Sequence, residues 1–241
     1  MSAELGLSAK ISMESLESAP FRFVNQALSS APLRPRGATV RGESAKRVMD
    51  VVLAAALLAV AAPFIATMAV AVAACGGSAL YGHERVGRNG RAFRCWKIRT
   101  MRLDAAAALE DLLRSDPVCR RQWAAARKLA PDPRTTRLGR ILRHTGLDEL
   151  PQLWNVLVGE MSLVGPRPVT REELARYGAS VVHYCAVRPG ITGAWQVGRR
   201  PGTTYDERVA MDRAYVEGRS LRGDLRLLVL TLGVLAAPGG R

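Results

Sequence analysis

Cysteine and histidine are scarce in this chain. Its 241 residues include only four cysteines and three histidines. No two cysteines form a CxxC pair, and no cysteine–histidine cluster has the spacing of zinc ligands. The sequence therefore indicates neither a disulfide framework nor a zinc-held module. Free thiols are typical of a reducing compartment and fit a cytoplasmic location.

Aromatic and acidic residues are also few. Aromatic side chains make up only 5% of the chain, so stacking on nucleic-acid bases is not the first expectation. Lysine and arginine number 35 against 21 acidic residues, which gives a formal net charge of +14. Such an excess implies an anionic partner: nucleic acid, anionic lipid or a phosphorylated substrate.

Charge is absent from one long apolar segment, residues 51–77. A run of about 20 apolar residues is enough to cross a bilayer. Basic residues beside such a segment tend to stay on the cytoplasmic side, and here they stand at both ends. They are Lys46 and Arg47 before the segment, and His83, Arg85, Arg88 and Arg91 after it.

Pro63 lies near the middle of the apolar segment. A proline inside a helix removes a hydrogen bond, collides with the preceding turn and costs about 3 kcal/mol. Each half of the segment is too short to cross a bilayer by itself. We therefore expect a re-entrant helix–break–helix hairpin that dips into one leaflet. A single crossing and a pair of soluble core helices are the alternatives.

The whole chain divides into three predicted regions: a flexible N-terminal arm over 1–45, the membrane segment over 46–78 and a cytoplasmic domain over 79–241. Asn89-Gly90 predicts a β-hairpin, after which Lys97 and Arg99 point to one face. The expected fold is mainly α with this small β-hairpin. Helices are predicted over 105–130 with an interruption near Pro117, and over 147–157, 171–177, 205–217 and 225–237, with a short helix or loop over 136–143 and a loop over 188–193.

Two adjacent acids, Asp148 and Glu149, stand at the start of an amphipathic helix. One interpretation is a nucleophile or metal ligand beside a second acid. The other is helix capping, because Thr145 and Asp148 match the [ST]-x-x-[DE] pattern. The predicted apolar face carries Leu147, Leu150, Leu153, Trp154, Leu157 and Val158, and the polar face carries Asp148, Gln152 and Asn155.

Arginines surround the acidic pair in the sequence. Arg167 stands between Pro166 and Pro168, which stiffen its loop and present a guanidinium suited to phosphate oxygens. Arg137, Arg140 and Arg143 precede the pair closely. The alternative is a basic surface that faces solvent or anionic lipid. No P-loop is present, and Gly87-Arg88-Asn89-Gly90 lacks the strand–helix context of a dinucleotide fingerprint.

The chain carries an ordered series of motifs that resembles the bacterial sugar transferases, the monotopic polyprenyl-phosphate phosphoglycosyl transferases. The series covers residues 46–235. It comprises the Pro-broken apolar segment after Lys46-Arg47, Glu84-Arg85-Val86-Gly87-Arg88-Asn89-Gly90, Lys97-Ile98-Arg99-Thr100-Met101, Asp132-Pro133-Arg134-Thr135, the run Leu147 to Leu157 after Leu142-Arg143, Met161 to Pro168, and Arg188-Pro189-Gly190-Ile191-Thr192-Gly193.

The resemblance implies an exopolysaccharide- or capsule-initiating enzyme on the cytoplasmic face of the inner membrane. Such an enzyme transfers a hexose-1-phosphate from a UDP-sugar to undecaprenyl phosphate through a phosphosugar–aspartyl intermediate, with Mg²⁺ as cofactor. Its partners are these two substrates and the membrane leaflet, not nucleic acid; a homodimer is left open. Residues 79–241 form the catalytic domain in this interpretation.

By resemblance, Asp148 is the nucleophile and a metal ligand, and Glu149 is its acidic partner. Arg143 and Arg167 resemble phosphate-binding positions, and Lys97 resembles a hairpin lysine near the site, with Arg99 beside it. Three departures stand out: Gly146 replaces a usual serine, Ala62 replaces a serine before Pro63, and Gly198-Arg199-Arg200-Pro201 replaces Ser-Gly-Arg-Asn. A non-catalytic basic membrane-tethered protein and an inactive paralogue are the remaining alternatives.

Overall fold

The structure is a computed structural model that describes residues 40–236, except 75, 127–128, 130–131, 199 and 201. The predicted arm lies outside these residues up to position 39, and its last residues, 40–45, begin a helix. Internal contacts divide the chain into two compact units. Of the described residues, unit 1 comprises 40–47, Glu84–Phe93 and Gly159–Thr231, and unit 2 comprises Val48–His83, Arg94–Val158 and 232–236.

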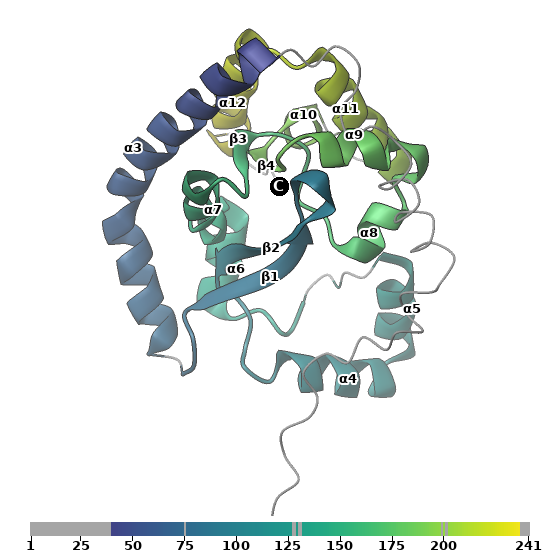
Figure 1. The fold of residues 1–241 in the computed structure, drawn as a ribbon. Coiled ribbons are helices and arrows are strands. Elements are labelled where there is room, and N and C mark those ends of the chain that lie inside the picture. Colours follow the sequence, from purple (N-terminus) through teal and green to yellow (C-terminus); the bar gives the residue numbers. More distant parts are fainter. Residues whose placement is uncertain are drawn as a thin grey trace, which may run out of the picture. The chain divides into compact units, whose positions relative to one another are not determined.

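Helix α3 (Val40–Ala73) is continuous across Pro63, so the predicted division into two shorter helices is not observed (Figure 1). The hydroxyl of Thr67 donates to the carbonyl of Pro63 (2.8 Å). Among the described residues α3 is the one helix that is long and apolar enough to cross a membrane. Its most apolar window has a mean hydropathy of 2.4, and only 6% of that window is buried inside the protein.

The first turns of α3 belong to unit 1 and are held there by ion pairs. Glu43 pairs with Arg88 (3.0 Å) and Arg219 (3.5 Å), and Lys46 pairs with Asp224 (3.4 Å). Asp224 is almost fully buried and also accepts a hydrogen bond from the hydroxyl of Tyr215 (2.8 Å). Ion pairs therefore hold the amino-terminal end of the apolar helix against the rest of unit 1.

The predicted β-hairpin is confirmed. Strands β1 (Leu80–Val86) and β2 (Ala92–Ile98) form a two-stranded sheet, joined by the 3-10 turn η1 (Arg88–Gly90). Asn89 and Gly90 both have positive φ (59° and 73°), the backbone conformation that made this dipeptide a turn signal. The amide of Gly87 donates to the carbonyl of Arg91 (2.7 Å) and closes the loop.

Unit 2 packs short helices around the carboxyl-terminal part of α3. Val72, Ile98 and Leu142 form a buried cluster, and Phe64 and Met68 of α3 pack against it. The prediction of a helical stretch interrupted near Pro117 is confirmed. The helical elements are α4 (Ala105–Ser115), α5 (Pro117–Ala126), α6 (Arg137–Thr145), the 3-10 turn η2 (Leu147–Glu149) and α7 (Gln152–Val158).

Unit 1 contains a second small sheet, and one of its strands lies within residues 188–193, where the sequence predicted a loop. Strands β3 (Ser162–Val164) and β4 (Gly190–Thr192) pair in parallel, with Ser162 opposite Gly190. A Cβ on Gly190 would lie 2.1 Å from the backbone nitrogen of Gly165, so only glycine allows this approach. The helical elements of this part are α8 (Arg171–Ala175), η3 (Gly178–Ser180), α9 (Val181–Ala186), α10 (Ala194–Gly198), α11 (Tyr205–Gly218) and α12 (Leu221–Ala236).

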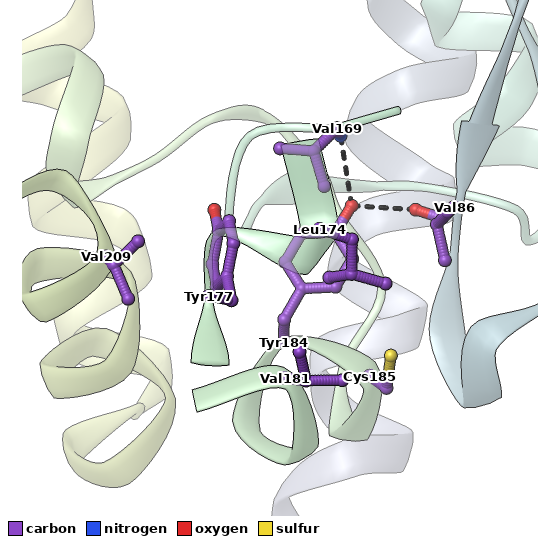
Figure 2. Close-up of a cluster of buried hydrophobic side chains, with 8 residues drawn as sticks. All are labelled: Val86, Val169, Leu174, Tyr177, Val181, Tyr184, Cys185 and Val209. Atoms are coloured by element: carbon purple, nitrogen blue, oxygen red, sulfur yellow. Dashed lines mark hydrogen bonds between the residues drawn. The ribbon is translucent and has the colours of Figure 1, made fainter. Parts of the chain in front are cut away.

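Tyr184 organises the core of unit 1 (Figure 2). Its buried hydroxyl donates to the carbonyl of Val86 (2.7 Å) and accepts from the amide of Val169 (3.2 Å). It thereby ties the hairpin to the segment that follows β3. The cluster drawn in Figure 2 comprises Val86, Val169, Leu174, Tyr177, Val181, Tyr184, Cys185 and Val209.

A buried carboxylate lies beside this core. Asp212 is 2% exposed and accepts a hydrogen bond from the hydroxyl of Tyr177 (2.7 Å). Burial raises the pKa of Asp212 to about 6, although Tyr177, Arg208 and Arg167 act in the opposite direction. The nearest nitrogen of Arg208 is 4.0 Å from the carboxylate, too far for a hydrogen bond. The protein therefore disfavours the charged form of this acid.

We predict that Asp212→Asn stabilises the protein above about pH 6 and leaves stability unchanged near pH 4. The folded-state pKa lies above the ordinary value, so wild-type stability from this group falls as pH rises toward about 6. Asparagine removes that loss and still accepts from Tyr177. The gain at pH 7.5 should reach at most about 3 kcal/mol. Chemical denaturation at both pH values measures it.

The control for this prediction is Asp111→Asn, because Asp111 is 76% exposed. That variant should follow the wild-type pH dependence. If Asp212→Asn also kept the wild-type dependence, the assignment of the raised pKa to burial of Asp212 would be wrong.

Candidate functional site

A glycine turn places the two adjacent acids. Helix α6 ends at Thr145 and is followed by the cap residue Gly146, whose φ of 72° is left-handed and suits glycine. The next residues form the 3-10 turn η2, which carries Asp148 and Glu149. The departure from serine at position 146 therefore matches the local backbone. The capping interpretation is wrong, because Thr145 is the last residue of α6 and its hydroxyl donates to the carbonyl of Ile141 (2.9 Å).

The segment from Asp148 to Val158 buries its polar face, whereas the predicted apolar face is divided between buried Leu153 and exposed residues. Asp148 is 7% exposed, Gln152 2% and Asn155 0%. Two members of the predicted apolar face, Trp154 and Val158, are 54% and 50% exposed. Hydrogen bonds between Asn155 and the backbone of β2 hold this part of the polar face inward.

Lys97 of β2 reaches the acidic turn. Its ammonium group lies 2.7 Å from a carboxylate oxygen of Glu149, and both side chains are mostly buried. Arg99 points elsewhere: its guanidinium donates to the carbonyl of Gly76, and its amide donates to Ala79 (2.8 Å). Of the two hairpin cations predicted near the site, the structure therefore brings only Lys97 to the acidic pair.

Arg143 lies in the last turn of α6, where two threonine hydroxyls hold it. Its guanidinium donates to Thr100 (2.8 Å) and Thr135 (3.2 Å). Helix α6 can approach Thr100 because Gly139 has no side chain; a Cβ there would lie 2.1 Å from the carbonyl oxygen of Thr100. These two hydrogen-bond partners are neutral, so they orient the positive charge of Arg143 without cancelling it.

Sequence reasoning did not find these two threonines. Both belong to quoted motifs, Lys97-Ile98-Arg99-Thr100-Met101 and Asp132-Pro133-Arg134-Thr135. An isolated bridge between Met101 and Thr135 brings the two motifs together. The two motifs both occur close to the basic helix in the motif series, and this was the signal that could have placed the two threonines near each other.

Arg167 belongs to unit 1, whereas the other predicted site residues belong to unit 2. Its loop is fixed against β4: the amide of Gly165 donates to Thr192 (2.9 Å), and the amide of Gly190 donates to Pro166 (2.8 Å). Within the described part of the chain, no hydrogen bond or ion pair engages the Arg167 guanidinium. The loop is therefore hydrogen-bonded to β4, and its arginine retains its donors.

The described residues contain no group of three or more His, Cys, Asp and Glu side chains that could hold a metal ion. Asp148 and Glu149 offer a two-carboxylate donor set instead. Proteins commonly hold Mg²⁺ through one or two carboxylates together with phosphates of the substrate. That mode of binding needs no cluster of protein ligands, so a carboxylate such as Asp148 is compatible with it.

The bacterial sugar transferase family matches this chain over residues 41–237. A UDP-galactose-lipid carrier transferase of Erwinia amylovora is 47% identical over 195 residues, which are 81% of this chain and 41% of that protein. An undecaprenyl-phosphate galactose phosphotransferase of Salmonella typhimurium is 45% identical, with the same two coverages. The chain therefore spans about two fifths of the length of these two relatives.

Another relative is covered over most of its own length. The exopolysaccharide production protein ExoY of Rhizobium meliloti is 44% identical over 200 residues, which are 83% of this chain and 88% of that protein. The family match covers far more than half of the chain and includes the acidic turn, the hairpin and the Arg167 loop. The chain belongs to the bacterial sugar transferase family.

Proposed function

We propose that this protein is a phosphoglycosyl transferase that moves a hexose-1-phosphate from a UDP-sugar to undecaprenyl phosphate. The product would begin a lipid-linked exopolysaccharide or capsule. The observation that carries the proposal is the buried carboxylate of Asp148 beside the Lys97–Glu149 ion pair. A family relative named for galactose phosphotransfer to undecaprenyl phosphate supports the substrate class.

Asp148 is the proposed nucleophile. Its carboxylate oxygen attacks the phosphorus that carries the sugar and breaks the bond to the UMP leaving group, which departs with the bonding electrons. An oxygen of undecaprenyl phosphate then attacks the same phosphorus and releases Asp148. A carboxylate approaching a diphosphate meets charge repulsion, which nearby cations offset.

The cations of the chain have distinct proposed roles in this scheme. Lys97 compensates the charge of Glu149, which lessens the repulsion between the acidic turn and the substrate. Arg143 is assigned to phosphate oxygens, a role supported by its neutral hydrogen-bond partners. Arg167 is assigned the same role separately, because no hydrogen bond or ion pair engages its guanidinium within the described residues, although its charge acts on Asp212. Bound Mg²⁺, held by Asp148, would supply further charge neutralisation of the diphosphate.

We further propose that α3 enters the membrane from the cytoplasmic face without crossing it. Its first turns pair with Arg88, Arg219 and Asp224, all of which follow the helix in the sequence. A crossing would put Glu43 and Lys46 on the opposite side of the bilayer from these partners. Basic residues flank both ends of the helix, which also favours the cytoplasmic side for both ends.

Exposed apolar side chains are consistent with membrane contact outside α3. Such residues are common singly, but here they recur on helices of both units. They include Ile141, Trp154 and Val158 in unit 2, and Leu225, Val229 and Leu230 in unit 1.

The nucleophile assignment predicts that Asp148→Asn abolishes transfer, by at least about 10³-fold, while membrane association is retained. Full-length protein, polyprenyl phosphate and a panel of UDP-sugars are mixed, and UMP release is measured. Asp111→Asn, a change on the exposed face of α4, should keep wild-type activity. Full transfer by Asp148→Asn would show that another residue is the nucleophile. Absence of UMP release by the wild type with every donor would overturn the enzyme proposal.

The topology predicts that the arm before α3 stays on the cytoplasmic side. A membrane-impermeant thiol reagent added to intact spheroplasts should not label Lys10→Cys, and labelling should appear after permeabilisation. Glu110→Cys, at a residue 72% exposed on α4, is the matched control and should behave in the same way. Labelling of position 10 alone in intact spheroplasts would establish a crossing helix.

A further inference from the structure

One buried amide side chain connects the hairpin to the acidic segment. Asn155 of α7 is 0% exposed. Its side-chain oxygen accepts from the amide of Trp96 (3.0 Å), and its side-chain nitrogen donates to the carbonyl of Arg94 (2.7 Å). The amide group of Asn155 thus offers β2 one acceptor and one donor, as a neighbouring strand would.

These two bonds lie next to the residues of the proposed site. Trp96 immediately precedes Lys97 in β2. Glu149 and Asn155 belong to one continuous segment, in which Leu150 bonds back to Leu147 (3.3 Å) and Leu153 to Leu150 (3.0 Å). The Asn155 contacts therefore join the two pieces of chain that carry the Lys97–Glu149 pair.

We propose that Asn155 is a positioning residue for transfer: its two hydrogen bonds fix β2 against the acidic segment and so set Lys97 against Glu149, beside Asp148. The role of this pair in transfer rests on the proposed function, whereas the alignment itself does not. A displacement of about 1 Å in such a constellation can cost about 100-fold in rate.

The chemistry at position 155 requires both a donor and an acceptor. An ionised aspartate has acceptors only, so it would face the carbonyl of Arg94 with no proton to share. A protonated aspartic acid has an O–H donor and a carbonyl acceptor and restores the pattern. Burial raises the pKa of a carboxyl group, so an aspartate introduced here should change between these states in an accessible pH range.

Charged groups on the packed segments bear on that titration. They are Arg94 and Lys97 on β2 and Asp148 and Glu149 on η2; α7 itself carries none. These groups can change the rate with pH in the wild type as well. The pH response of the variant is therefore expressed as the ratio of its kcat to the wild-type kcat at each pH.

The kinetic experiment compares Asn155→Asp, Asn155→Ala and Val156→Ala in the full-length protein. We expect kcat of Asn155→Asp to be about 100-fold below that of the wild type at pH 8.5. At pH 6 the variant should be at most about tenfold below the wild type. Asn155→Ala should lose about 100-fold at both pH values, with KM for the donor changed less than about threefold. Val156 is buried in the same helix, so Val156→Ala controls for destabilisation.

A second measurement is independent of activity. A carbodiimide that joins amines to carboxylates without a spacer should cross-link Lys97 to Glu149 in the wild type, since the two groups are 2.7 Å apart. We expect the yield to drop about tenfold in Asn155→Ala and to persist in Val156→Ala, because only the first change releases the alignment.

Each result decides the inference separately from the proposed function. An unchanged cross-link in folded Asn155→Ala would overturn the positioning role, whatever the enzyme does. Equal loss of kcat in Asn155→Asp at both pH values, or an equal loss in Val156→Ala, would also overturn it, because a merely structural residue gives no selective recovery. A wild type without transfer activity would refute the function but leave the cross-linking result standing.

Discussion

The ion pair between Lys97 and Glu149 is the contact on which the acidic turn depends. It joins strand β2 to a segment distant in the sequence, and it places a cation within 2.7 Å of one of two adjacent acids. Asp148 is 7% exposed beside it. Burying a carboxylate such as Glu149 without a compensating cation would cost several kcal/mol. The hairpin, the turn at Gly146 and helix α7 all contribute to keeping this charge arrangement together.

Local signals predicted the elements whose chemistry is local. Asn89-Gly90 predicted the hairpin because both residues take positive φ there, and Pro117 marked the boundary between α4 and α5. The β3–β4 sheet had no such signal. Its strands have three residues each and pair in parallel across a long connection, so their pairing depends on contacts that sequence periodicity does not contain.

The candidate site was predictable as a list of residues but not as a set of contacts. Periodicity identified the polar face of the acidic segment, yet it could not tell that this face points inward. That orientation depends on the backbone of β2, which satisfies the buried amide of Asn155. Family resemblance pointed to Lys97 and Arg143, but the partners that orient them, Glu149 and the two threonines Thr100 and Thr135, follow only from tertiary structure.

The apolar helix is also part of the protein's interior. Phe64, Met68 and Val72 of α3 pack against Ile98 and Leu142, so its carboxyl-terminal part completes the core of unit 2. A shortened chain without α3 would therefore not be a water-soluble version of the same domain. It would expose the apolar side chains of β2 and α6 that pack against α3, and it would weaken the packing of the elements that carry Lys97 and Arg143. Solubilisation of this protein should keep the helix and replace the lipid around it.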